Sequence, residues 1–94
     1  MKARLLYEFK QYYDDGAMVE MVIWEVPESV PGSSHRYKYR LYFGYPGRRV
    51  IGFDNESGKG DHRHSEGKES PYDFVSVERL VEDFLAEVAT RRKA

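Results

Sequence analysis

A polar segment in the second half of the chain holds most of the side chains that could carry out chemistry. No apolar side chain occurs from residue 54 to residue 70. Such a connection is longer than usual for a small domain, so it is predicted to be a functional loop or a disordered one. Its reactive side chains are Asp54, Lys59, Asp61, His62 and His64. The sequence therefore indicates a site here more clearly than it names a reaction.

The spacing of two histidines in this segment suits acid–base chemistry. In an extended segment, residues two apart project to the same side, so the rings of His62 and His64 would face one substrate. Imidazole titrates near neutral pH, so one ring can accept a proton while the other donates one. Cleavage of an RNA phosphodiester needs such a pair. Asp54 would then orient one ring, and Lys59 and Arg63 would stabilise the phosphate charge.

Metal binding is an alternative use of the same residues. His62 and His64 would supply two nitrogen ligands, and Asp61 or Asp54 an oxygen ligand. The chain has no cysteine, which excludes disulfides, thiolate zinc sites and cysteine nucleophiles. Because the list of ligands is so short, no metal or other cofactor is predicted, and the metal set His62, His64 and Asp61 stays an alternative. Solvated loop histidines without a function are a further alternative.

The segment Gly58-Lys59-Gly60 resembles a shortened phosphate-binding loop, with bare backbone amides and an ammonium group. It lacks the length and the helix of a true P-loop, so hydrolysis of nucleoside triphosphates is not predicted. A flexible turn with an exposed lysine is the commoner explanation. His35 is expected to be a surface histidine.

A second candidate for binding is a basic strand upstream of the polar segment. Residues 35–44 alternate in character, so that Arg36, Lys38 and Arg40 share one face with Tyr42. Cations interleaved with aromatic rings suit single-stranded RNA, although a solvated strand face is the alternative. The net charge is −1, so affinity for nucleic acid must come from such local clustering. Asn55 would position substrate or simply form a turn.

Alternating patterns and turn signals predict the elements that would hold these residues. Asp15-Gly16 reads as a two-residue hairpin loop between strands over residues 3–13 and 18–26, pairing Phe9 with Val22. A turn at Tyr45-Pro46-Gly47 separates strands over residues 35–44 and 48–55. A three-residue loop there would pair Lys38 with Asp54.

The end of the chain is predicted to be a helix over residues 76–92, with Ser76 as its N-cap. The expected fold is α+β: a mostly antiparallel four-stranded sheet (ββββα) with one C-terminal helix packed on one face, in a single domain over residues 1–94. No apolar run approaches the roughly 18 residues of a membrane span, and no signal-peptide core is present. A cytoplasmic location without membrane contact is therefore expected.

Three motifs also carry a family resemblance. They are Phe53-Asp54-Asn55, Asp61-His62-Arg63-His64, and Ser76-Val77-Glu78 at the start of the terminal helix. With them the chain resembles the TumE family of small toxins from bacterial and archaeal toxin–antitoxin modules, over nearly its whole length. It is especially similar to a branch with Gly58-Lys59-Gly60 before the histidines and Pro71-Tyr72 after them.

The resemblance implies a cytoplasmic toxin encoded beside a small antitoxin, often a helix-turn-helix DNA-binding protein. It also implies a ribonuclease that blocks translation, with the activity carried by His62, His64, Asp54 and Lys59. The alternative is a non-enzymatic module that binds RNA or protein through the basic third strand. Because one helix covers only one face of an aromatic-rich sheet, a homodimer is a further expectation.

Overall fold

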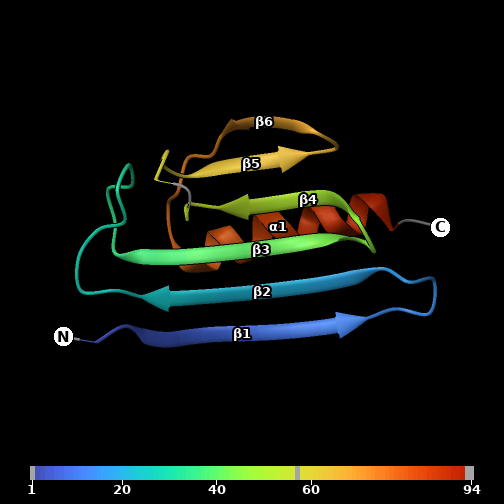
Figure 1. The fold of residues 1–94 in the computed structure, drawn as a ribbon, viewed down its shortest axis with the longest axis horizontal. Coiled ribbons are helices and arrows are strands. Elements are labelled where there is room, and N and C mark those ends of the chain that lie inside the picture. Colours follow the sequence, from blue (N-terminus) through green and yellow to red (C-terminus); the bar gives the residue numbers. More distant parts are fainter. Residues whose placement is uncertain (1, 57, 93–94) are drawn as a thin grey trace.

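The computed structural model, which describes residues 2–56 and 58–92, consists of one antiparallel sheet and one helix (Figure 1). Ser57, inside the predicted polar loop, and residues 1, 93 and 94 lie outside the described residues. The strands pair in chain order, each with its neighbours in sequence. Their bounds are β1 Arg4–Tyr12, β2 Met18–Glu25, β3 Tyr37–Tyr45, β4 Arg48–Asp54, β5 His62–Ser65 and β6 Lys68–Pro71, followed by α1 at Val77–Arg91.

The predicted α+β fold with a C-terminal helix on one face of an antiparallel sheet is confirmed, but the predicted number of strands is wrong. The sheet has six strands rather than four, because part of the polar segment 54–70 forms β5 and β6. Glu66 and Gly67 connect these two strands, and both have positive φ, at 48° and 89°. Positive φ at both positions is typical of a type I′ hairpin turn.

The core lies between α1 and the central strands, which pass in front of the helix in Figure 1. Alternate residues of β2, β3 and β4 point toward the helix, and their side chains are fully or almost fully buried. The larger ones are Met21, Ile23, Tyr39, Leu41, Phe43, Ile51 and Phe53. The helix leaves β1 uncovered, and every residue of that edge strand is exposed.

Helix α1 begins as the sequence predicted. The hydroxyl of Ser76 accepts a hydrogen bond from the backbone N–H of Arg79, which satisfies one free amide of the first turn. Leu80, Phe84 and Val88 form its buried stripe. Within residues 2–56 and 58–92, no helix is both long and apolar enough to cross a membrane.

The first hairpin turns over three residues rather than the predicted two. The N–H of Tyr13 donates to the carbonyl of Ala17 at 2.8 Å, which leaves residues 14–16 as the loop. Phe9 therefore pairs with Met21 and not with Val22. A shift of one residue in register moves the side chains of one strand to the opposite face relative to its partner. Met21 therefore points toward the helix side and Val22 away from it.

The second hairpin corrects the predicted pairing of Asp54. Residues 46–47 form a two-residue turn, and β4 then carries one extra residue, Val50, opposite the step from Phe43 to Gly44. With a two-residue turn alone, polar residues of β3 would lie opposite apolar residues of β4. The β-bulge shifts the register so that apolar residues again share one face. As a result Asp54 pairs with Arg40, not with Lys38 as the three-residue loop predicted.

Candidate functional site

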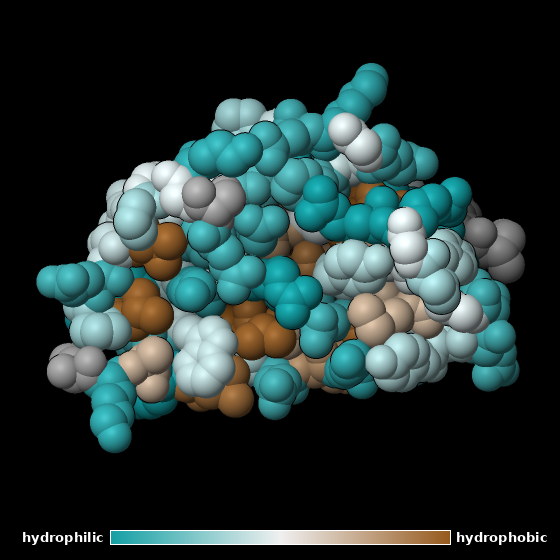
Figure 2. All heavy atoms as spheres, viewed as in Figure 1, coloured by the Kyte–Doolittle hydropathy of each residue, from teal (hydrophilic) through white to brown (hydrophobic). Residues whose placement is uncertain are grey.

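The face of the sheet away from α1, called the open face below, brings both predicted histidines beside a carboxylate. His62 of β5 lies opposite Asp54 of β4, and His64 lies opposite Gly52. Glu69 of β6 lies opposite His64. Because alternate residues of a strand share a face, both imidazoles project to the same side, as their spacing predicted. Figure 2 shows the open face, which is largely hydrophilic in its upper part, where β5 and β6 lie.

The Nε2 atoms of both histidines face the same two carboxylates. His62 Nε2 lies 3.1 Å from Asp54 Oδ1 and 3.4 Å from Glu69 Oε2. His64 Nε2 lies 3.6 Å from Asp54 Oδ2 and 3.4 Å from the same Glu69 oxygen. The two rings meet edge to face, with their centroids 4.9 Å apart. We refer to Asp54, His62 and His64 as the histidine cluster.

The ring of His62 is held from behind by the backbone. Its Nδ1 lies 2.9 Å from the carbonyl oxygen of Gly60, and its side chain is almost completely buried. A carbonyl only accepts hydrogen bonds, so Nδ1 carries the proton in this contact and Nε2 is left to face the carboxylates. Gly60 in turn lies against Gly32, since a Cβ added to Gly60 would come within 2.8 Å of the Gly32 carbonyl oxygen. The loop before β3 therefore helps to position His62.

Arg49, which the sequence placed near the basic strand but not near the histidines, lies beside His64. A Cβ added to Gly52 would lie 2.8 Å from Cδ of Arg49 and 3.6 Å from Nη1, so the arginine side chain runs across this glycine. Gly52 faces His64 on the next strand. A glycine inside a strand often marks such a close approach, and this is the signal that could have identified Arg49. Lys59 lies at the rim, with Nζ 3.7 Å from Glu69 Oε1.

The surroundings of His64 favour its neutral form. Burial lowers the pKa of His64 most, and the charge of Arg49 lowers it further. The carboxylates of Asp54 and Glu69 act in the opposite direction but do not cancel these effects, so the pKa of His64 lies below its usual 6.5. His64 can therefore accept a proton at neutral pH.

Comparison with known families gives the chain an assignment. A family model described as toxin TumE matches residues 2–92. The chain belongs to the TumE toxin family. The resemblance read from its motifs is thereby confirmed, and the match includes every strand and the helix. No curated protein and no solved structure matches the chain.

In this TumE family member, Asp61 belongs to a second network and does not join the histidine cluster. It accepts hydrogen bonds from the hydroxyls of Ser33 and Tyr39, both at 2.6 Å, and its Oδ2 lies 2.7 Å from His35 Nε2. Asp54, rather than Asp61, lies close enough to the two histidines to bind a metal ion together with them. The predicted alternative ligand set is corrected accordingly. His35 is also more enclosed than expected, with its side chain 13% exposed.

Asn55 is buried beneath the site instead of facing a substrate. Its side chain is fully buried, accepts a hydrogen bond from the N–H of Tyr39 and donates to the carbonyl of Tyr37 at 2.7 Å. It also donates to Ser33 at 3.2 Å. Asn55 therefore joins the end of β4 to the start of β3, and the predicted contact with substrate is replaced by this structural role.

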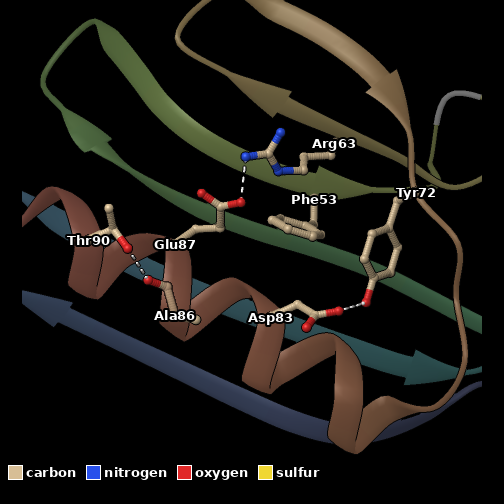
Figure 3. A pocket seen from close by; sticks show the side chains of 7 residues that line it. All are labelled: Phe53, Arg63, Tyr72, Asp83, Ala86, Glu87 and Thr90. Carbon is tan, nitrogen blue, oxygen red and sulfur yellow. Dashed lines mark hydrogen bonds and ion pairs between the residues drawn. The ribbon is translucent and has the colours of Figure 1, made fainter.

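Arg63 points to the opposite side of the sheet from the histidines. Figure 3 shows its guanidinium reaching Glu87 of α1, above a pocket of about 400 Å³. Tyr72 and Asp83 close the other end of the same pocket with a hydrogen bond of 2.7 Å. Because it lies on the helix side, Arg63 does not reach a phosphate bound at the histidine cluster. Arg49 replaces it as the neighbouring arginine.

The basic strand face is partly neutralised. Arg40 pairs with Glu20 at 3.2 Å and lies 3.7 Å from a carboxylate oxygen of Glu56. Lys38 faces Trp24 across β2 and β3 on the same open side, whereas Arg36 precedes β3. Arg40 adjoins Asp54 in the register of β3 and β4. The open face thus offers a charged and aromatic track that leads to the histidine cluster.

Proposed function

We propose that this TumE family member is the toxin of a prokaryotic toxin–antitoxin module and that it acts in the cytoplasm as a metal-independent endoribonuclease. The observation that carries the proposal is the convergence of His62 Nε2 and His64 Nε2 beside Asp54, with Arg49 alongside. Two imidazoles, an orienting carboxylate and a nearby cation are the groups that cleavage of an RNA phosphodiester requires.

The contacts of the two histidines support a separate role for each in the proposed reaction. His64, whose neutral form is favoured, takes the proton of a ribose 2′-hydroxyl. The 2′-oxygen then attacks the adjacent phosphorus, and the bond from phosphorus to the 5′-oxygen of the next nucleotide breaks. His62 acts as an imidazolium. The Gly60 carbonyl holds its ring through Nδ1, Asp54 stabilises its charge at 3.1 Å, and its Nε2 donates a proton to that leaving oxygen. The products are a 2′,3′-cyclic phosphate and a free 5′-hydroxyl.

Positive charge beside the cluster supports the binding of a phosphate. The carboxylates of Asp54 and Glu69 alone would repel an RNA backbone, and Arg49 and Lys59 offset them. Both cations lie at the rim of the cluster, where they stabilise the charge that develops on the phosphate oxygens. Lys38 and Arg40 extend this binding along β3.

Cleavage of RNA by the purified protein in the presence of EDTA tests the proposal. The wild-type protein is expected to cut RNA without added metal and to arrest growth when it is expressed alone. His62→Ala and His64→Ala each remove one proton-transfer group, so each is expected to lower the cleavage rate by about 10²-fold or more and to relieve the arrest. His35→Gln is the matched histidine control and should stay active. Full toxicity of both alanine variants would overturn the proposal.

A second candidate is a non-enzymatic module that binds RNA or protein through β3. The track formed by Trp24, Lys38 and Arg40 on the open face favours it. In that case charge reversal with Arg36→Glu and Arg40→Glu should abolish toxicity, while His62→Ala and His64→Ala should have little effect. The two sets of variants therefore separate the candidates.

The proposed partner is an antitoxin encoded beside this gene, for which a helix-turn-helix DNA-binding protein is the expected type. The edge strand β1 offers a surface for such a protein, because its apolar side chains are 37–42% exposed at Leu5, Leu6, Tyr7 and Phe9. Self-association through the same edge would give the homodimer. Co-expression with the neighbouring gene, followed by measurement of growth, RNA integrity and complex size, tests this assignment.

A further inference from the structure

Two histidine nitrogens and two carboxylate groups gather on the open face. His62 Nε2 lies 3.1 Å from Asp54 Oδ1, His64 Nε2 lies 3.6 Å from Asp54 Oδ2, and both nitrogens lie 3.4 Å from Glu69 Oε2. We propose that Asp54, His62 and His64 form a binding site for a divalent transition-metal ion, with Glu69 beside them and Zn²⁺ as the best match. The binding itself follows from geometry and does not depend on the ribonuclease activity.

The distances fit the coordination sphere of zinc. Bonds of about 2.0–2.1 Å from zinc to nitrogen or oxygen place tetrahedral ligands roughly 3.3 Å from one another. The separations between each histidine nitrogen and the carboxylate oxygens are 3.1, 3.4, 3.4 and 3.6 Å. The donor atoms of Asp54, His62 and His64 all lie within 4.8 Å of one another. These three donors are therefore close enough to one another to share one ion.

The surroundings of the ligands favour metal binding as well. His62 directs Nδ1 to the carbonyl of Gly60. Metal-binding histidines usually have such a hydrogen bond on the nitrogen that does not bind the metal, and it holds the ring in place. Asp54 and His62 are direct partners across β4 and β5, and Glu69 and His64 across β5 and β6. The ligands therefore come from three adjacent strands that are paired with one another.

The donor set also selects the class of ion. Imidazole nitrogens suit zinc, copper, nickel and iron, whereas Mg²⁺ and Ca²⁺ prefer sites made of oxygen alone. Zn²⁺ is therefore the probe of choice and Mg²⁺ the control. A bound ion would occupy both Nε2 lone pairs. If the proposed function holds, Zn²⁺ is then expected to inhibit cleavage of RNA, because the base and the acid are no longer free.

Calorimetric titration of metal-free, untagged protein with ZnCl2 tests the site. The wild-type protein should bind one ion, and MgCl2 should give no comparable signal. Asp54→Asn, His62→Ala and His64→Ala should each weaken zinc binding by about tenfold or more, and Glu69→Gln should weaken it to a smaller extent. The matched controls His35→Gln and Asp73→Asn should bind zinc as the wild type does. Absence of zinc binding, or equal binding by the ligand variants, would overturn the inference.

A second measurement keeps the test valid if a variant fails to fold. In the wild-type protein, NMR signals of the rings of His62 and His64 should shift on addition of Zn²⁺, while those of His35 should not. Shifts at His35 alone would contradict the site.

Cleavage assays then separate this inference from the proposed function. Activity in EDTA that is abolished by Zn²⁺ supports both. Activity in EDTA without any zinc binding overturns the site alone. Zinc binding together with activity that EDTA removes and Zn²⁺ restores supports the site but overturns the metal-independent mechanism.

Discussion

Arg49 lies across Gly52 on the open face, although residues three apart in a regular strand point to opposite faces. The bulge at Val50 resolves this conflict, because the extra residue in β4 changes the alternation between the two positions. Gly52 supplies the space, since any larger residue there would meet the arginine side chain. One bulge and one glycine thus bring a positive charge next to His64.

Arg49→Gln should raise the pKa of His64. After burial, the charge of Arg49 is the main cause that lowers this pKa, and Asp54 and Glu69 would then act on His64 less opposed. Because His64 is the proposed base, the acid limb of the pH–rate profile should move to higher pH and activity at low pH should fall. NMR titration of the His64 ring measures the pKa directly. Arg48→Gln, which removes the neighbouring exposed arginine, is the control and should leave the titration unchanged.

Asp61→Asn should destabilise the fold by about 1–3 kcal/mol, because a carboxylate that accepts hydrogen bonds from Ser33 and Tyr39 and faces His35 is lost. Burial alone would raise the pKa of Asp61, but these contacts lower it below 3.8 overall. Its contribution to stability is thus present above pH 3.8 and is lost as the pH falls through the lower folded pKa. Urea unfolding at several pH values measures both effects. Asp73→Asn is the matched control, and an equal loss in both variants would contradict the prediction.

Asn55→Ala should reduce stability without a specific effect on RNA. The substitution leaves the N–H of Tyr39 and the carbonyl of Tyr37 buried without their side-chain partner, and a buried unpaired group costs about 1–3 kcal/mol. Chemical unfolding should therefore show a lower free energy of unfolding. RNA binding per folded molecule should match that of the wild type. A selective loss of RNA affinity with unchanged stability would restore Asn55 to the binding site.

The sequence predicts the centre of the site better than its surroundings. His62 and His64 share a face because of their spacing, and Asp54 ends a strand that the alternating pattern identifies. The hairpin that carries the histidines escaped prediction because apolar and polar residues do not alternate over residues 62–71. One face of this hairpin is open, and the other packs on the helix through charged contacts such as Arg63 with Glu87.

Turn chemistry explains the remaining differences. Glu66-Gly67 is a weaker turn signal than Asn-Gly or Asp-Gly, although it adopts the same positive φ angles. The bulge at Val50 has no distinct sequence signature, so the pairing of Asp54 with Arg40 and the position of Arg49 could not be derived. Asp61 and Asn55 are polar residues in a polar segment, and only the fold shows that contacts with the loop before β3 bury them.

Gly52→Ala should reproduce the effects of Arg49→Gln while leaving the fold intact. The backbone at Gly52 has no positive φ, and the nearest atom to an added Cβ is Cδ of the flexible Arg49 side chain at 2.8 Å, so the arginine moves and the strand does not. The pKa of His64 should therefore rise, and cleavage should fall toward the level of Arg49→Gln, a loss of about 10²-fold if the guanidinium stabilises the phosphate.

The double variant Gly52→Ala with Arg49→Gln tests whether Gly52 acts on His64 only through Arg49. Because both substitutions remove the same charge from His64, their effects should not add, as is expected of residues in contact. Gly44→Ala provides the contrast. Its Cβ would clash with the backbone carbonyl oxygen of Arg48, so this substitution should destabilise the fold. Additive effects on the His64 pKa, or a Gly52→Ala variant whose His64 titrates as in the wild type, would mean that Arg49 acts from some other position.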